Sequence, residues 1–325
     1  MKILITGVAG FIGFHLAKQL IKNHSNIIGI DNLNDYYDIN LKKSRLSILK
    51  EAGLKFVKVD ITDKTVLDKF FAKEQFNIIV HLAAQAGVRH SIDKPYIYLD
   101  SNIRGFLNIL ELARHNKLDH LIYASSSSVY GLSDKFSFSE NDMTDKQVSL
   151  YAASKKSNEV MAYSYSNLYK IPCTGLRFFT AYGPWGRPDM AYFKFVKKII
   201  NNEIIDVYGK GKMYRDFTYI DDVITALIKL IPKPPKFNLK INKNTPHEIF
   251  NIGNNKPESL EKFIGIIENE LGKKAKRNYL PMQLGDVQKT SANIDKINQV
   301  VDFVPQTSIE EGLCLFIQWY RSYYR

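Results

Sequence analysis

Two side chains four positions apart, Tyr151 and Lys155, have the types and spacing of a proton-transfer pair. On a helix, positions i and i+4 lie on one face, so the lysine ammonium can stabilise a tyrosine phenolate. We expect this charge to lower the phenol pKa from about 10 towards neutrality, where a phenolate can act as a general base. Ser126, within the serine run 125–128, supplies a hydroxyl that can share the same proton. The spacing alone also fits an ordinary surface Tyr–Lys pair. The neighbouring strands and helices are therefore needed to distinguish a catalytic pair from a surface pair.

The segment Gly7–Gly13 follows a G-x-x-G-x-x-G pattern between an apolar strand pattern and an amphipathic helix pattern. Its glycines serve either a tight turn or the close approach of a pyrophosphate, whose charge then lies at the helix N-terminus. Asp31 ends the next strand pattern about 20 residues further on, where a carboxylate accepts hydrogen bonds from an adenosine ribose and repels a 2′-phosphate. The segment therefore predicts NAD rather than NADP. Asp60 and Ile61 follow the third strand pattern, where they contact the adenine edge or, for Asp60, cap a helix.

Strand and helix patterns alternate through the first 178 residues. The expected strands are Lys2–Thr6, Ile27–Asp31, Lys55–Val59, Asn77–His81, His120–Ala124 and Thr174–Phe178. The expected helices are Ile12–Lys22, Leu41–Glu51, Lys64–Ala72, Tyr96–His115 and Tyr151–Tyr169. This alternation predicts an α/β fold of the Rossmann type, in which right-handed crossovers build a doubly wound parallel sheet. Such a fold brings the glycine segment and the serine run to one edge of the sheet, which favours the catalytic interpretation of Tyr151 and Lys155.

After Phe178 the pattern changes to loops rich in Gly and Pro and to shorter helices. We therefore expect an NAD-binding Rossmann domain over residues 1–178 and a smaller α+β substrate-binding domain over residues 179–325. The run Ile249–Ile252 predicts a strand near residues 247–254 that returns to the first domain. The Pro-, Lys- and Asn-rich stretch Ile231–Pro246 predicts an exposed loop.

The composition excludes several other classes of protein. With 45% hydrophobic and 24% charged residues among 325, the chain can bury a large core. No apolar stretch reaches bilayer-spanning length, and glycines interrupt the apolar start of the chain, so neither a membrane span nor a signal peptide is expected. Cys173 and Cys314 are too few for a disulfide framework and lack metal-ligand spacing, which favours packed thiols in a reducing cytoplasm and predicts no metal site.

The net charge of +12 is spread along the chain, with small basic clusters near residues 194–198 and 273–277. No aromatic-interleaved or zinc-finger pattern accompanies these clusters. We expect a solvated basic surface or the attraction of a small acidic substrate, and no nucleic-acid or membrane partner.

Several segments together resemble the extended short-chain dehydrogenase/reductase family of nucleotide-sugar enzymes, over nearly the whole chain. They are Gly7–Gly13, His81–Arg89, Asn102, the serine run, Tyr151–Lys155 and Arg215–Asp222. Within this family, Asp31–Asp38 and Leu176–Met190 are most similar to UDP-glucuronate 4-epimerases.

The resemblance implies reversible C4 epimerisation of UDP-glucuronate to UDP-galacturonate through a 4-keto intermediate, with transient hydride transfer to bound NAD. It implies Tyr151, Lys155 and Ser126 as catalytic residues. The implied cofactor-binding residues are Gly7, Gly10, Phe11, Ile12, Gly13, Asp31, Asn32, Asp60, Ile61, Leu82, Ala83, Ala84, Tyr151 and Lys155. It also implies a homodimer built from the helices near Tyr96–His115 and Tyr151–Tyr169.

The implied substrate-binding residues surround a UDP-sugar. They are Ser126, Ser127, Ser128, Thr180, Arg187, Arg215, Asp286, Gln85 and Arg89. Arg187 and Arg215 contact the diphosphate or close structural ion pairs, and Asp286 corresponds to the residue that holds the uridine ribose. Gln85 and Arg89 border the sugar or serve packing. Our hypothesis is that hydroxyls of residues 126–128 and Thr180 hold the sugar carboxylate out of alignment with the 4-keto group, which prevents loss of CO₂.

Other functions remain open at this point. Related dehydratases and decarboxylases carry acidic residues in the serine run, where this chain has Ser127 and Ser128, so elimination and decarboxylation are disfavoured. A 4-epimerase of UDP-N-acetylhexosamine or its uronate is the next enzyme candidate. A non-catalytic nucleotide-binding scaffold is the candidate from a different class, because fold does not dictate function.

Overall fold

The structure is a computed structural model that describes residues 1–23, 26–133, 135–236, 245–283 and 285–324. The largest sheet among these residues has seven strands in the order β10-β6-β5-β4-β1-β2-β3, and all neighbouring strands are parallel. The strands are β1 (Ile3–Thr6), β2 (Ile27–Asp31), β3 (Lys55–Lys58), β4 (Ile78–His81), β5 (His120–Ser126), β6 (Cys173–Phe178) and β10 (His247–Ile252). This is the Rossmann order with one further strand. The predicted fold class is confirmed.

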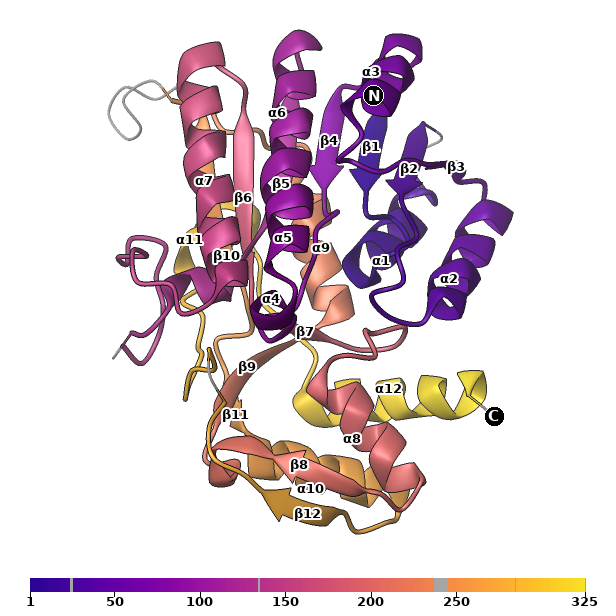
Figure 1. The fold of residues 1–325 in the computed structure, drawn as a ribbon, viewed down its shortest axis with the longest axis vertical. Coiled ribbons are helices and arrows are strands. Elements are labelled where there is room, and N and C mark those ends of the chain that lie inside the picture. The colour runs from indigo at the N-terminus through magenta and orange to yellow at the C-terminus, as the bar shows by residue number, and fades with distance from the viewer. Residues whose placement is uncertain (24–25, 134, 237–244, 284, 325) are drawn as a thin grey trace.

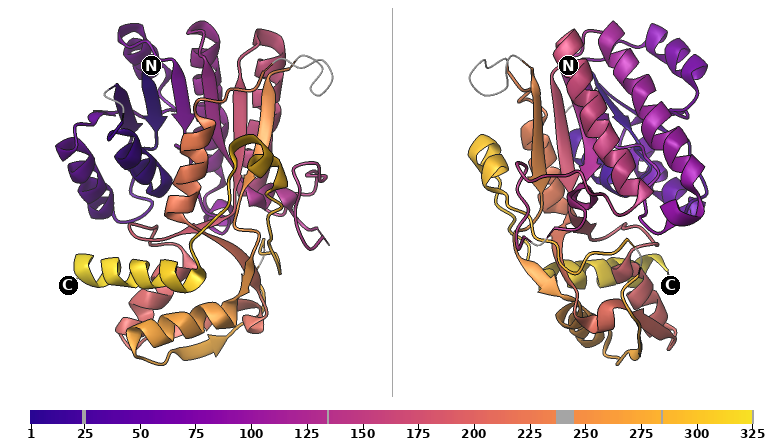
Figure 2. Two further views of the ribbon diagram at one scale, coloured as in Figure 1. Left: turned by 180° about the vertical axis from the view of Figure 1, so that it is seen from behind. Right: turned by 60° about the vertical axis from the view of Figure 1, so that its left-hand side comes forward.

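Helices cover both faces of this sheet, because its central strands are apolar on both sides. Every residue of β1, β2 and β4 is buried, as expected for parallel strands. Figures 1 and 2 show the two helical layers. One layer comprises α1 (Phe11–Leu20), α2 (Ile39–Glu51) and α9 (Ile220–Leu230), and the other α3 (Lys64–Lys73), α6 (Gly105–His115) and α7 (Leu150–Tyr169). Within the described ranges, each helix is too short or too polar to span a lipid bilayer.

A smaller part of the molecule lies below the large sheet in Figure 1, at the carboxyl ends of its strands. It contains a three-stranded sheet of β7 (Thr180–Tyr182), β9 (Tyr214–Tyr219) and β11 (Pro257–Ser259), and a pair of β8 (Ile204–Val207) with β12 (Lys276–Tyr279). The helices of this part are α8 (Ala191–Ile200), α10 (Leu260–Leu271) and α12 (Ile309–Tyr323). Aromatic rings of α12 pack against Trp185 and Phe193, which joins this helix to the rest.

The expected helix Tyr96–His115 is interrupted in the structure. It divides into α5 (Pro95–Tyr98), a π-helix over Leu99–Arg104, and α6. Asn102 of the π-helix is buried, and its amide group bonds to both the backbone N–H and the carbonyl of Gln85. The wider turn directs this side chain towards the end of β4, and π-turns are frequent at functional sites.

Two elements beyond residue 178 lie against the large sheet. β10 pairs with β6 at the position expected for a returning strand, and α9 packs on α1, which the sequence analysis did not expect. Further along, α11 (Asp295–Val301) lies beside β10. The division into two binding domains at residue 178 stays a prediction. Half of the expected loop Ile231–Pro246, residues 237–244, lies outside the described residues.

Candidate active site

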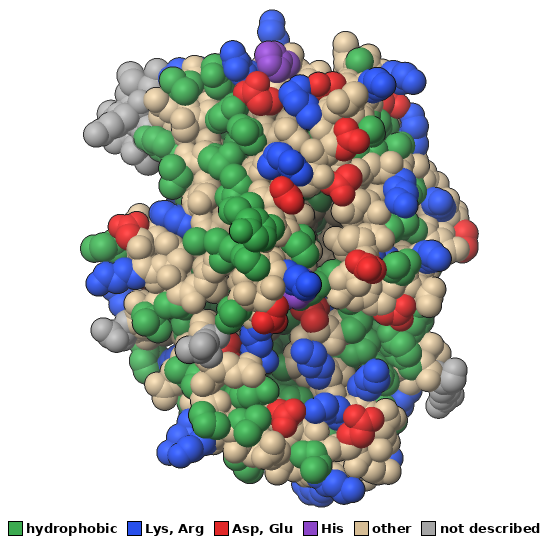
Figure 3. Space-filling model, viewed as in Figure 1, with side chains coloured by type: hydrophobic (Ala, Val, Ile, Leu, Met, Phe, Trp, Pro, Cys, Tyr) green, Lys and Arg blue, Asp and Glu red, His purple; other side chains and the backbone are tan. Residues whose placement is uncertain are grey.

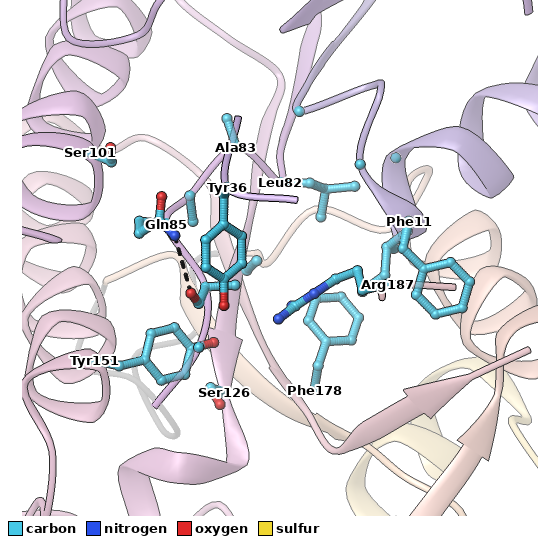
Figure 4. Close-up of a pocket in the computed structure, with 18 of the residues that line it drawn as sticks. Phe11, Tyr36, Leu82, Ala83, Gln85, Ser101, Ser126, Tyr151, Phe178 and Arg187 are labelled. Atoms are coloured by element: carbon cyan, nitrogen blue, oxygen red, sulfur yellow. Dashed lines mark hydrogen bonds between the residues drawn. The ribbon is translucent and has the colours of Figure 1, made fainter. Parts of the chain in front are cut away.

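A cavity of about 390 Å³ lies at the carboxyl ends of the large-sheet strands. Figure 4 shows four side chains that point into it from different parts of the chain. Tyr151 comes from α7, Ser126 from the end of β5, Arg187 from the loop between β7 and α8, and Tyr36 from the loop after β2. Ligands of doubly wound sheets bind at this edge. The cavity is therefore the candidate active site.

The glycine loop joins β1 to α1 and lines this cavity. Gly7 has a φ of +72°, and a Cβ on Gly13 would lie 2.3 Å from the Gly7 carbonyl oxygen. The N-cap residue Gly10 makes no side-chain cap, so the first N–H groups of α1 are available to an anion. The loop therefore fits the pyrophosphate of NAD.

Gly13→Ala is expected to abolish the retention of NAD. The added Cβ would lie 2.3 Å from the Gly7 carbonyl oxygen, so the loop would have to open. The measurement is the amount of NAD released per chain when the purified protein is denatured. Gly265→Ala in α10 is the matched control, because a Cβ there has no neighbour within 4 Å and NAD content should not change. Full NAD content in Gly13→Ala would contradict this role of the loop.

Asp31 lies at the end of β2, next to the glycine loop. Its Oδ2 accepts a hydrogen bond from the Ala9 N–H at 3.1 Å, and its Oδ1 accepts one from the Leu33 N–H at 2.8 Å. Burial raises the pKa of Asp31 above its usual value, and the two backbone hydrogen bonds offset only part of this increase. The carboxylate is therefore fixed in the position where the sequence predicts the adenosine ribose.

Asp60 follows β3, and its side chain bonds to Asn32 instead of capping a helix. Its Oδ2 accepts a hydrogen bond from Asn32 Nδ2 at 2.9 Å, and its Oδ1 accepts one from the Thr62 N–H at 2.8 Å. The cap of α3 is Asp63, so the helix-cap interpretation of Asp60 is wrong. Asn32 and Asp60 both line the cavity.

Tyr151 lies in the first turn of α7, opposite Ser126. Burial raises the pKa of the Tyr151 phenol above its usual value, and the nearby Ser126 hydroxyl and the positive charge of Arg187 offset only part of this increase. Lys155 Nζ donates to the Ala124 carbonyl at 2.9 Å, and burial lowers the pKa of this lysine to about 8. Lys155 is not among the groups that shift the phenol pKa in this structure, so the expectation that its charge helps to lower this pKa stays a prediction. Desolvation has the largest effect, and groups from other elements oppose it.

Arg187, which lines the cavity, forms an ion pair with Asp189. Its Nε donates to Asp189 Oδ1 at 3.0 Å and its Nη2 donates to Asp189 Oδ2 at 2.5 Å. The Tyr36 hydroxyl donates to the same Oδ2 at 3.1 Å. The ion pair that the sequence left open for Arg187 is thus present, while its guanidinium also lies near the Tyr151 phenol.

A second cavity of about 130 Å³ adjoins the first and shares some of its lining. The shared residues are Val88, Ser127, Ser128 and Thr180. Arg215 and Asp286 line only the second cavity. The Arg215 Nη1 donates to two backbone carbonyls, and no carboxylate of the described residues forms an ion pair with it. Its charge is therefore available to an anionic ligand.

Gln85 and Arg89 lie in different surroundings. Gln85 lines the first cavity, and its Nε2 donates to the Ala86 carbonyl, the bond drawn in Figure 4. Arg89 lines neither cavity, pairs with Asp286 Oδ2 at 2.9 Å and lies 4.7 Å above the ring of Tyr208.

Every candidate residue other than Arg89 lines one of the two cavities. Those of the cofactor group are Gly7, Gly10, Phe11, Ile12, Gly13, Asp31, Asn32, Asp60, Ile61, Leu82, Ala83, Ala84, Tyr151 and Lys155.

The sequence analysis did not single out Tyr36, which lines the cavity, or Asp189, which bonds to Tyr36 and Arg187. Both lie in segments that carried the family resemblance, but they are 153 positions apart. No spacing rule relates residues at that separation. Only the tyrosine-rich pattern after Asp31 and the acid two positions after Arg187 could have drawn attention to them.

Comparisons with known proteins agree on one family. Residues 3–253 match the NAD dependent epimerase/dehydratase family. The chain is 52% identical to Protein CapI of Staphylococcus aureus, with 100% of both chains covered. It is 45% identical to the probable UDP-glucuronate 4-epimerase of Rhizobium meliloti, over 100% of this chain and 98% of that protein. It also resembles the solved structure of UDP-glucuronic acid 4-epimerase from Bacillus cereus in complex with UDP-glucuronic acid and NAD, at a TM-score of 0.90, 34% identity and 99% coverage of each chain.

Proposed function

This chain belongs to the NAD dependent epimerase/dehydratase family, and from that premise we propose that it interconverts UDP-glucuronate and UDP-galacturonate by epimerisation at C4. The observation that carries the proposal is the position of Tyr151. Its phenol faces the cavity lined by the glycine loop, and the hydroxyls of Ser127, Ser128 and Thr180 lie at the junction with the second cavity. The relatives and the neighbouring structure named above support the sugar and the cofactor.

In this proposal Tyr151 removes the proton of the sugar 4-hydroxyl and returns it when the second epimer forms. Bound NAD supplies the two-electron chemistry by which C4 is oxidised and reduced again. Ser126, which lines the same cavity, stabilises the phenolate form by donating a hydrogen bond to it during proton transfer. The Arg187 guanidinium acts in the same direction through its charge.

The hydroxyls at the junction suit a carboxylate at C6 of the sugar. A 4-keto uronic acid is a β-keto acid, which loses CO₂ when its C5–carboxylate bond aligns with the carbonyl π system. Hydrogen bonds from Ser127, Ser128 and Thr180 hold that bond out of alignment. Arg215, in the second cavity, provides the positive charge that a diphosphate requires.

The proposal also assigns one ligand to each of the two domains and a cellular compartment to the protein. Residues 1–178 bind NAD, residues 179–325 bind the UDP-sugar, and Asp286, which pairs with Arg89 in this structure, holds the uridine ribose. Cys173 and Cys314 are free thiols, which suits the reducing cytoplasm.

The experiment is a direct assay of substrate choice. The purified protein is incubated without added reductant with UDP-glucuronate, UDP-glucose or either UDP-N-acetylhexosamine, and each product is identified by NMR. We expect UDP-galacturonate from UDP-glucuronate at an equilibrium mixture, and slower or no conversion of the other sugars. Faster conversion of an N-acetylated sugar would replace this proposal by the alternative epimerase, and no conversion of any sugar would favour a scaffold.

We further propose that the enzyme is a homodimer formed through α6 and α7. Figure 3 shows hydrophobic side chains gathered over this face of the molecule. The exposed hydrophobic side chains of α5 and α7 include Tyr96, Val160 and Leu168, which are 78%, 58% and 63% exposed. A contiguous apolar area of this kind marks an interaction surface. Light scattering should give twice the mass of one chain.

A further inference from the structure

Three successive residues at the end of β5 lie opposite three residues of α7 that are one turn apart, and two of these pairs are hydrogen-bonded. The Ala124 carbonyl accepts a hydrogen bond from Lys155 Nζ at 2.9 Å. The Ser125 hydroxyl donates to Glu159 Oε1 at 2.6 Å, and Ser126 and Tyr151 line the same cavity. Positions 151, 155 and 159 share one face of the helix, because they follow the i, i+4, i+8 spacing.

Glu159 is the member of this set to which neither the sequence analysis nor the proposed mechanism gives a role. It is 3% exposed, and besides Ser125 it accepts hydrogen bonds from Arg177 Nε at 2.8 Å and Arg177 Nη2 at 2.9 Å. Arg177 lies directly opposite Ser125 in the register of β5 and β6. One carboxylate therefore fixes α7 against two neighbouring strands.

A buried ion pair is weak evidence for stability, because desolvation of both charges offsets most of their attraction. What the Glu159–Arg177 pair does provide is a rigid acceptor for the Ser125 hydroxyl. Ser125 precedes Ser126, whose Oγ already accepts a hydrogen bond from the Ser128 N–H at 3.1 Å and so has its own proton left for Tyr151. A displacement of Ser125 is transmitted to this hydroxyl through the backbone.

We propose that Glu159 is a positioning residue, which acts through Ser125 to hold the Ser126 hydroxyl against the Tyr151 phenol. The inference rests on the proposed function, since it assumes that Tyr151 transfers the proton. Small errors in such an alignment are costly, because a displacement of about 1 Å can lower a rate by about 10²-fold.

Ser125→Ala tests the inference with the least disturbance, because it removes one hydroxyl and leaves the Glu159–Arg177 pair in place. We expect kcat to fall about tenfold while KM changes by less than about twofold, since the lost alignment affects the reacting geometry and not the binding of substrate. We also expect the ascending limb of the pH profile of kcat to move to higher pH, because a displaced Ser126 no longer lowers the Tyr151 pKa. The other titratable or charged groups near the phenol stay unchanged in this variant: Arg187, Asp189, Tyr36, Tyr98 and Lys155.

Thr174→Val is the matched control. Its hydroxyl bonds to His120 Nε2 at 2.7 Å, is fully buried and also links β5 with β6, but at the opposite ends of these strands. The Thr174→Val variant should lower the melting temperature about as much as Ser125→Ala does, and it should leave kcat and the pH profile of kcat unchanged. Glu159→Gln provides a second variant, in which Arg177 loses its charged partner and kcat falls at least as far as in Ser125→Ala.

The outcomes separate this inference from the proposed function. If the wild-type protein converts no UDP-sugar, the proposed function fails. If the wild type is active and Ser125→Ala keeps its kcat and pH profile, the positioning role of Glu159 is rejected, whether or not Glu159→Gln folds. Equal losses of kcat in Ser125→Ala and Thr174→Val would likewise reject it in favour of a purely structural role.

Discussion

Tyr151→Phe is expected to lower kcat about 10³-fold while NAD content and the melting temperature stay close to those of the wild type. The phenol is the group that faces both Ser126 and Arg187, and phenylalanine keeps its ring but cannot carry the proton of the 4-hydroxyl. The ring also packs edge-on against Tyr98 at a centroid distance of 6.2 Å, a contact that phenylalanine retains. The measurements are the rate of UDP-galacturonate formation by NMR and the NAD released on denaturation.

Tyr163→Phe is the matched control for this prediction. Tyr163 belongs to the same helix and is 49% exposed, so removal of its hydroxyl should leave kcat unchanged. A kcat within tenfold of the wild type in Tyr151→Phe would mean that another group moves the proton. Unchanged function of any kind would revive the scaffold interpretation.

Ser127→Ala and Thr180→Asn are expected to turn a trace of UDP-pentose into a major product. Each change removes a hydroxyl from the junction between the two cavities, and the uronic carboxylate of the 4-keto intermediate then rotates into alignment with the carbonyl. Loss of CO₂ from C5 competes with the return of electrons to C4. The ratio of pentose to hexuronate products, read by NMR at several times, measures this competition.

The product ratio distinguishes this effect from a simple loss of rate. Ser157→Ala serves as the control, because its hydroxyl donates to the Ala153 carbonyl within α7 and lines neither cavity. Total turnover should fall modestly in the two junction variants, whereas the control should keep both rate and ratio. An unchanged product ratio in both junction variants rejects the hydroxyl hypothesis.

Local patterns were sufficient to predict the cofactor half of the site. The strand, the glycine loop and the helix that follows are consecutive in the chain, so Gly7 and Gly13 reveal the turn that they form. The alternation of strands and helices, with nearly universal right-handed crossovers, then predicts a doubly wound parallel sheet. Asp31 could be located in the same way, because it ends the strand next to β1.

Contacts between distant segments could not be predicted in this way. The i+4 spacing of Tyr151 and Lys155 suggested a direct charge effect, but the ammonium bonds to a carbonyl 31 positions away and burial dominates the phenol pKa. The bond between Tyr36 and Asp189 likewise depends on how the smaller part of the molecule meets the large sheet. Such contacts have no period along the chain, so only the folded structure reveals them.

The continuous lining shared by the two cavities has a consequence for the cell. A sugar that turns over at this junction needs no exchange of dinucleotide with the surroundings, because the electrons taken from one epimer go back into the other. The final ratio of the two sugars then depends on their relative free energies alone. The enzyme would therefore need neither an external oxidant nor an external reductant, and its flux would follow the demand for its product instead of the supply of reducing power.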